Sequence, residues 1–194
     1  MIVLDIESSG LDCGKCGIWQ IGALDLKSGN TFLQEARLDE GDEITEEALM
    51  ITGKTKMDLL DNNQQSQKQL INNFLDWVKD FKERVIAGHN VGWDMSFIQN
   101  KCFKYGLHDK FMKIIGYRAI DLHTLAMLKY KEKHGKFKLR EEKSGMNLPT
   151  VLEFCGMKDT RMSIRNHKIV KEGKPHNALE DCKLEAECFR RLLK

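Results

Sequence analysis

The chain of 194 residues carries 31 Lys and Arg against 29 Asp and Glu, a formal net charge of +2, and 41% of its residues are hydrophobic. This length and composition predict one globular domain over residues 1–194 and exclude a disordered or fibrous chain. No apolar run approaches the roughly 18 residues of a membrane span, and the first residues lack the basic segment of a secretory signal. We therefore expect a soluble, intracellular (cytoplasmic) protein with no membrane partner.

The first half of the chain predicts strands followed by helices. Residues 2–6, 18–26 and 31–34 are predicted as strands, and the loop or hairpin connections between them make an antiparallel meander. Short helices are expected after Thr45 and over 57–61. A longer helix is expected over 67–81, where apolar residues form one stripe.

The second half alternates short strands with helices. A strand over 85–87 precedes a helix over 92–105 that Gly106 closes. A strand over 119–120 leads into a helix over 122–130, and two further helices cover 147–155 and the residues from Pro175 to Leu193. Together these elements predict an α/β fold: a mixed central sheet of about five strands, the first three antiparallel, flanked by helices.

Cysteines and basic residues are unevenly distributed. Only Cys13 and Cys16 are close together, and a structural zinc site needs about four ligands, so this pair is interpreted as two free thiols in a loop, with metal or redox use as the alternative. Residues 129–174 carry thirteen Lys and Arg and only six acids. A local anionic partner is therefore expected there, against the alternative of a solvated excursion. Residues 131–143 are the least core-like part and are expected to protrude.

Two acids interrupt the first apolar strand. Side chains alternate across a strand, so Asp5 and Glu7 share one face. Two like charges beside a buried strand are costly, and a hard divalent cation such as Mg²⁺ or Mn²⁺ removes that cost by using both as ligands. The alternative is a strand end whose acids point into solvent.

Two later segments carry similar chemistry. Asp94 is expected in the first turn of the helix after residues 88–90, at the end of the sheet where loops build sites; the alternative is a favourable interaction with the helix dipole. His176 is expected on the loop that enters the last helix, and Asp181 within its first turns. This division suits a mobile base and a rigid metal ligand, whereas the alternative makes His176 an ordinary helix-entry residue.

The three segments together resemble a known family. Asp5-x-Glu7, His89-Asn90-x-x-x-Asp94 and His176-x-x-x-x-Asp181 resemble, in order and spacing, the motifs of the DEDDh 3′–5′ exonucleases, the DnaQ-like, proofreading-subunit type of the ribonuclease H-like superfamily. The likeness extends over nearly the whole chain, through IESSGLD, IWQIGAL, ITEEALMITGKTKMDLL, AIDLHTLAML and LPTVLEFCG. The departures are Ser8-Ser9 for the commoner Thr-Thr, Trp93 where Phe is frequent, and the longer basic stretch 129–143.

The resemblance implies a ribonuclease H-like exonuclease domain with a metal-dependent activity. It implies hydrolysis from the 3′ end of single-stranded DNA by a two-metal mechanism, which releases nucleoside 5′-monophosphates in replication, proofreading or repair. The cofactors would be two divalent cations, Mg²⁺ or Mn²⁺, with His176 as the general base. The catalytic residues would be Asp5, Glu7, Asp94, His176 and Asp181, and the four acids among them would hold the metals.

The resemblance also implies substrate contacts, which are the backbone at Ser8 and Ser9 together with Leu11, His89, Asn90 and Phe97. Core packing is the alternative for Leu11 and Phe97. Arg165, with Arg161 and Lys168, is expected to bind phosphates, with solvated loop residues as the alternative. The partner would be a nucleic acid with a single-stranded 3′ end, and a DNA polymerase or replication protein is the further option.

Two other functions stay open at this point. The first is an exoribonuclease that trims RNA or short oligonucleotides, since the same catalytic residues serve both reactions and contacts to the 2′-hydroxyl decide between them. The second is a non-catalytic nucleic-acid-binding module, which the presence of all five catalytic residues disfavours.

Overall fold

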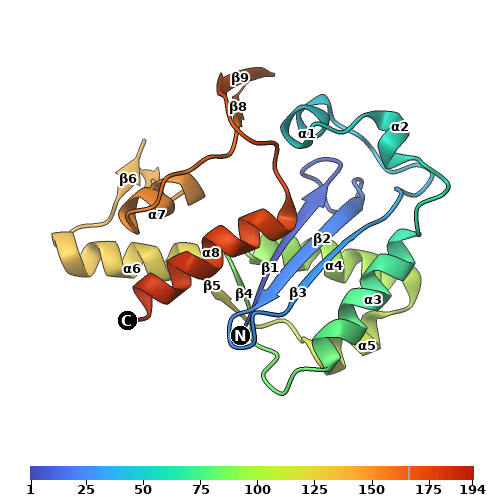
Figure 1. Ribbon diagram of the computed structural model, residues 1–194, viewed down its shortest axis with the longest axis horizontal. Coiled ribbons are helices and arrows are strands. Elements are labelled where there is room, and N and C mark those ends of the chain that lie inside the picture. Colours follow the sequence, from blue (N-terminus) through green and yellow to red (C-terminus); the bar gives the residue numbers. More distant parts are fainter. Residues whose placement is uncertain (166) are drawn as a thin grey trace.

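The computed structural model describes residues 1–165 and 167–194, and a five-stranded sheet lies at its centre (Figure 1). The sheet has the order β3-β2-β1-β4-β5. Its strands are β1 (Ile2–Ser8), β2 (Ile18–Asp25), β3 (Thr31–Glu35), β4 (Ile86–Gly88) and β5 (Ala119–Asp121). The first three strands are antiparallel, and β4 and β5 continue the sheet in parallel. The predicted mixed sheet with an antiparallel meander is confirmed.

Helices cover both faces of this sheet. They are α1 (Glu46–Thr52), α2 (Lys56–Leu59), α3 (Gln67–Lys79), α4 (Gly92–Tyr105), α5 (His108–Ile114), α6 (Leu122–His134), α7 (Leu148–Phe154) and α8 (Ala178–Leu192). Figure 1 shows α8 crossing in front of the sheet and α4 behind it. Among the described residues, no helix combines the length and the apolar character that crossing a membrane requires.

The alternation of side chains along β1 divides the core in two. Ile2, Leu4 and Ile6 pack with α3, α4 and α5 on one face of the sheet. Val3 packs with α6, α7 and α8 on the other face. Asp5 and Glu7 continue the row of Val3, so the acids point to the side that α8 covers.

The structure adds elements that the sequence pattern does not predict. These are α5 and two hairpins, formed by β6 (Leu139–Arg140) with β7 (Lys143–Ser144) and by β8 (Ser163–Arg165) with β9 (Lys168–Lys171). Their strands are short and mostly exposed, so they lack the alternation that marks a half-buried strand. Residues 131–144 are all exposed, which confirms the predicted protrusion. Helix α6 also runs four residues further than predicted, to its C-cap at Gly135.

One buried ion pair fixes the loop before α1. Lys101 Nζ of α4 lies 2.8 Å from Asp42 Oδ1, and both side chains are buried. The other oxygen of Asp42 accepts hydrogen bonds from Gln67 Nε2 at 2.6 Å and from the Asp39 amide at 3.1 Å. The next residue, Glu43, accepts a hydrogen bond from Ser9 through its carbonyl, so this network supports the loop that follows β1.

Candidate active site

Asp5 and Glu7 stand where the buried face of β1 reaches its carboxyl end. Val3, at the start of the same row, is buried in the core beneath α8. The row then changes from apolar to acidic, and both carboxylates line a pocket of about 860 Å³. The sheet therefore presents them at the edge of the core, where a ligand can reach them.

Gly22 allows α8 to approach this edge. It pairs with Asp5 across the β1–β2 ladder, and a Cβ on it would collide with the backbone of Ala178 and Leu179. A residue without a side chain is thus required where the first turn of α8 rests on the sheet. Gln20 of β2 fixes the same turn, because its Oε1 accepts a hydrogen bond from the Ala178 amide at 2.8 Å.

Asp94 reaches the pocket from the start of α4. The chain leaves β4 through Asn90, whose φ of 62° is left-handed, and Asp94 lies in the first turn of the helix. Its Oδ1 accepts a hydrogen bond from the Ile6 amide at 3.1 Å. Strand β4 pairs only with the first residues of β1, Ile2 and Val3. The Ile6 amide therefore bonds to Asp94 instead of to β4, and this hydrogen bond holds Asp94 against β1.

His176 and Asp181 arrive from the last segment. His176 lies in the loop before α8 and Asp181 in its first turn, as the sequence predicts. The Nδ1 atom of His176 is 3.5 Å from Asp181 Oδ2, and its Nε2 is 3.1 Å from the Met162 carbonyl. The His176 amide donates to the Ile51 carbonyl at 2.9 Å, which ties this loop to α1.

Arg161 lies inside the site and lines the pocket. Its guanidinium is buried, with Nη1 at 3.2 Å from Asp181 Oδ2 and Nε at 3.0 Å from Asp159 Oδ1. The alternative of a solvated loop residue is thereby excluded for Arg161, and its expected phosphate contact stays a prediction. Arg161 neutralises part of the acidic site, which a count of loop charges does not reveal.

Glu185 is a fifth acid that the motifs do not identify. It lies one turn after Asp181 on α8, is only 1% exposed and lines the pocket. Its Oε2 accepts a hydrogen bond from the His89 amide at 3.0 Å, across 96 residues of sequence. The available signal was its i, i+4 spacing from Asp181, which places both acids on one helix face.

Burial and mutual repulsion perturb all five acids. Burial raises the pKa of Glu7 to about 8, with a further contribution from Asp181, and burial raises the pKa of Asp94 to about 8. Burial, followed by repulsion from Asp94, holds the pKa values of Asp5 and Glu185 well above their ordinary range. Burial also raises the pKa of Asp181, although Arg161 opposes this shift. The site therefore favours any cation that neutralises it.

The residues fit a divalent cation. Glu7, His176 and Asp181 each offer a ligand atom, and these atoms lie within 4.8 Å of one another. Within the described part of the chain, the buried Oδ1 of Asp181 has no hydrogen-bond partner. Such an oxygen is costly to bury alone, and Mg²⁺ or Mn²⁺ prefers oxygen ligands of this kind.

Most of the predicted site residues meet in this pocket. Leu11 is 82% exposed at its rim, so the core-packing alternative for this residue is excluded. Cys13 and Cys16 are free, as predicted, and Cys16 lies in the pocket wall. The predicted residues that line the pocket are Asp5, Glu7, Ser8, Leu11, His89, Asn90, Asp94, His176 and Asp181.

Ser9, Phe97 and Arg165 are not part of the pocket lining. Phe97 is fully buried in the core, and Trp93, whose ring centroid is 4.6 Å from that of Phe97, lines the pocket instead. Ser9 Oγ donates to the Glu43 carbonyl at 2.6 Å and accepts from the Gly17 amide at 2.9 Å. Arg165 is exposed on β8. Phe97 thus acts in core packing, which corrects the expectation of a substrate contact for this residue. The Ser9 side chain is used within the protein, and the substrate contact expected of its backbone stays a prediction.

Comparison with known proteins gives a family match. The model of the RNase T exonuclease family matches residues 2–189. A DNA polymerase III PolC-type protein from Pediococcus pentosaceus is 26% identical over 130 residues, which is 66% of this chain and 8% of that protein. The chain therefore spans only a small part of this curated relative.

Solved structures share the fold. Exonuclease I of E. coli, in complex with a dT13 oligonucleotide, has a TM-score of 0.72 at 14% identity, over 100% of this chain and 40% of that one. The nuclease domain of 3′hExo, a DEDDh family member bound to rAMP, has a TM-score of 0.65 at 20% identity, over 99% of this chain and 90% of that one. These likenesses confirm the predicted ribonuclease H-like fold. Because the family match covers nearly the whole sequence, the chain belongs to the exonuclease family, as its DEDDh motifs predict.

Proposed function

We propose that this protein is a metal-dependent 3′–5′ exonuclease that removes nucleoside 5′-monophosphates from the 3′ end of single-stranded DNA. The observation that carries the proposal is the convergence of five acids and His176 on one pocket, from three distant segments of the chain. The pocket volume of about 860 Å³ is within the range of small-ligand sites and suits a terminal nucleotide.

Four of the acids would bind cations, and the fifth would hold a neighbouring turn in place. Asp5, Glu7 and Asp181 would hold one cation and Asp94 would help to hold a second, with Mg²⁺ or Mn²⁺ as the cofactor. When bound, the cations supply an acidified water and neutralise charge at the phosphate. Glu185 accepts a hydrogen bond from the His89 amide, and we propose that it holds in place the turn that carries Asn90.

His176 is proposed as the general base. In the tautomer that donates Nε2–H to the Met162 carbonyl, Nδ1 keeps its lone pair and faces Asp181 at 3.5 Å. That nitrogen can accept a proton from a water held among the carboxylates. The hydrogen bond from the His176 amide to the Ile51 carbonyl limits how far the loop can move, so the ring stays near the site.

An exoribonuclease is the second candidate. One solved relative is described as a 3′-exonuclease that recognises the 3′ end of a histone mRNA stem-loop, with a TM-score of 0.63 at 19% identity. The PolC-type relative is a DNA polymerase, and it supports DNA as substrate together with a role beside a polymerase or replication partner. The first proposal therefore keeps DNA, and the experiment includes RNA.

A side-by-side degradation assay tests the proposal. Single-stranded DNA, duplex DNA and RNA, each labelled at the 5′ end, are incubated with Mg²⁺, Mn²⁺ or a chelator. We expect stepwise shortening from the 3′ end of single-stranded DNA that the chelator abolishes. Faster shortening of RNA would favour the second candidate, and chelator-resistant or 5′-directed cleavage would contradict both.

The role of His176 is tested by His176→Ala. We expect kcat to fall by about 10²–10⁴-fold while KM changes little, because a general base acts in the chemical step. His108→Ala, at the start of α5 and outside the pocket lining, is the control and should keep full activity. A rise in KM with kcat unchanged would assign His176 to substrate binding instead.

A further inference from the structure

Residues 131–144, here called the basic arm, leave the body of the protein beside the pocket. The arm consists of the end of α6, its C-cap at Gly135 and the β6–β7 hairpin. Every residue in it is exposed, including Phe137 at 42% and Leu139 at 59%. A two-stranded hairpin has little stability of its own in water, so an exposed arm with apolar side chains calls for a physical explanation.

Aromatic rings hold several lysines of the arm in place. Lys131 Nζ lies 4.6 Å from the ring centroid of Phe137, and Lys138 Nζ lies 5.8 Å from that of Tyr130. Lys133 Nζ lies 5.5 Å from the ring of Phe154 on α7. Cation–π contacts of this kind leave the ammonium groups charged and partly free to bind a second, anionic partner.

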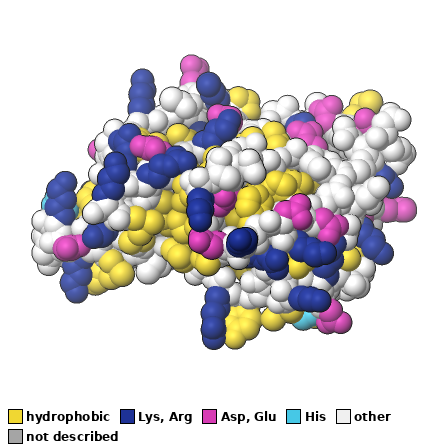
Figure 2. Space-filling view, turned by 60° about the horizontal axis from the view of Figure 1, so that its bottom comes forward, with side chains coloured by type: hydrophobic (Ala, Val, Ile, Leu, Met, Phe, Trp, Pro, Cys, Tyr) yellow, Lys and Arg dark blue, Asp and Glu magenta, His cyan; other side chains and the backbone are white. Residues whose placement is uncertain are grey.

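The basic residues of the arm outnumber its acids. The arm contains six Lys and Arg and three acids, and one of these acids, Glu132, pairs at 3.3 Å with Lys129, which precedes the arm. The other two, Glu141 and Glu142, occupy the hairpin turn with left-handed φ angles of 50° and 63°. Figure 2 shows Lys and Arg side chains spread over the left part of the molecule, the side on which α6 lies in Figure 1.

Short contacts connect the arm to the active site. Ser144 of β7 bonds to His123 Nε2 at 2.6 Å, and the ring of His123 packs edge-on against that of His89, 6.0 Å away. His89 Nε2 in turn lies 3.0 Å from the Met146 carbonyl, and His89 lines the pocket. Leu148 and Pro149, which follow the arm at the start of α7, also line the pocket. The arm is therefore continuous with the pocket wall.

We propose that the basic arm binds the single-stranded portion of the substrate 5′ of the nucleotides held in the pocket. This inference rests on the proposed function, and it assigns a second contact to the same strand. Lys131, Lys136, Lys138 and Arg140 supply cations for backbone phosphates, and the exposed ring of Phe137 offers a surface on which a base can stack. Longer strands should accordingly bind more tightly than strands that fill the pocket alone.

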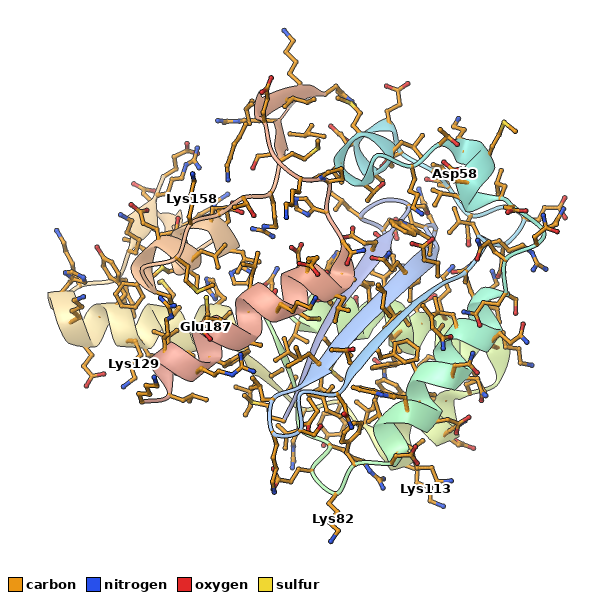
Figure 3. The ribbon with its side chains drawn as sticks, viewed as in Figure 1. Asp58, Lys82, Lys113, Lys129, Lys158 and Glu187 are labelled. Carbon is orange, nitrogen blue, oxygen red and sulfur yellow. The ribbon has the colours of Figure 1, made fainter. Side chains whose placement is uncertain are left out.

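The test compares oligothymidylates of about 4 and about 20 nucleotides, because nonspecific single-strand sites span about 4–16 nucleotides. Binding is measured by fluorescence anisotropy at several salt concentrations, in an Asp5→Asn background that prevents degradation. The variant combines Lys136→Ser, Lys138→Ser and Arg140→Ser. The control combines Lys79→Ser, Lys82→Ser and Lys113→Ser, which make the same charge change at exposed positions. Figure 3 labels Lys82 and Lys113 along the lower edge of the molecule, away from the arm.

We expect the arm variant to lose the length advantage of the longer strand. Its salt dependence should flatten by about 0.7 in log–log slope for each phosphate contact removed, and its affinity for the short strand should stay unchanged. The control should behave as the parent does. An unchanged length advantage in the arm variant, or an equal loss in the control, would overturn the proposal.

The same variants separate this proposal from the proposed function. With Asp5 restored, the arm variant should degrade the short strand at the parent rate, since the pocket is intact. If the parent protein degrades neither strand, the proposed function fails, while the anisotropy comparison still decides whether the arm binds nucleic acid.

Discussion

Two buried polar clusters of this protein differ in how far their negative charge is balanced. In the first, Lys101 and Asp42 form a close ion pair, and Gln67 and a backbone amide complete the hydrogen bonds of the carboxylate. In the second, five acids outnumber their basic neighbours: Arg161 and His176 both lie beside Asp181, and backbone amides donate to Asp94 and Glu185. One buried oxygen of Asp181 has no hydrogen-bond partner among the described residues.

The difference separates a structural cluster from a functional one. A buried ion pair whose hydrogen bonds are complete needs nothing further and fixes local geometry. A cluster with surplus negative charge is unfavourable by itself, so a protein retains it where a ligand supplies the missing charge. Burial alone does not distinguish them; the balance of charge does.

The largest expected effect comes from the unbalanced cluster. Asp5→Asn keeps the shape of the side chain but removes a metal ligand, so exonuclease activity should fall on the order of 10⁴-fold, the scale seen when one member of a catalytic unit is removed. The metal-free protein should unfold at an equal or higher temperature, because one repelling charge is gone. Near-normal degradation rates, or a large loss of stability in the metal-free protein, would show that Asp5 has a structural role instead.

The balanced cluster should respond in the opposite way. Lys101→Met leaves Asp42 buried without its cation, and breaking such a pair costs about 3–5 kcal/mol of unfolding free energy. Lys104→Met, three residues later on the same helix, removes a more exposed partner of Asp39 and should cost at most about 1 kcal/mol. Chemical denaturation measures both. Equal losses in the two variants would show that the buried pair has no special role.

A further expected effect is a change in stability with pH. Glu7 and Asp94 have pKa values of about 8 in the folded protein, against about 4 in an unfolded chain. Between about pH 5 and 8 the folded state therefore binds more protons, and the metal-free protein should lose stability as pH rises through this window. Asp25 and Asp39 have lowered pKa values, so their contributions are already complete at pH 5. Burial lowers the pKa of His89, so this group acts in the opposite direction.

Divalent cations should reverse that trend. At about 100 times its dissociation constant, a bound ion adds about 2.7 kcal/mol, which raises the melting temperature by about 5–11 °C in a chain of this size. The increase should be greater at pH 8 than at pH 5.5, since protons compete for the carboxylates. Melting curves with a chelator and with MnCl₂ give the comparison, and a metal-free protein that becomes more stable toward pH 8 would contradict it.

Local patterns in the sequence were sufficient to predict the strands and helices and the direction of their key side chains. The alternation in β1 places Asp5 and Glu7 on one face whatever surrounds them, and Gly106 ends α4 as the sequence predicts. The resemblance of the motifs to those of the DEDDh exonucleases singles out Asp94, His176 and Asp181, each a few residues from a recognisable partner in its motif. These features depend on residues a few positions apart, where backbone geometry alone relates one side chain to the next.

Only the tertiary structure decided the environment of those residues. Segments far apart in the chain meet where the His89 amide donates to Glu185 and where α8 packs against Gly22. The pairing of Arg161 with Asp181 likewise joins a loop to a helix. Phe97 and Trp93 carry similar rings four residues apart, yet one is core and the other lines the pocket. Such outcomes depend on which elements pack against a residue. Periodicity shows where a side chain points along its own element, and packing determines what it meets there.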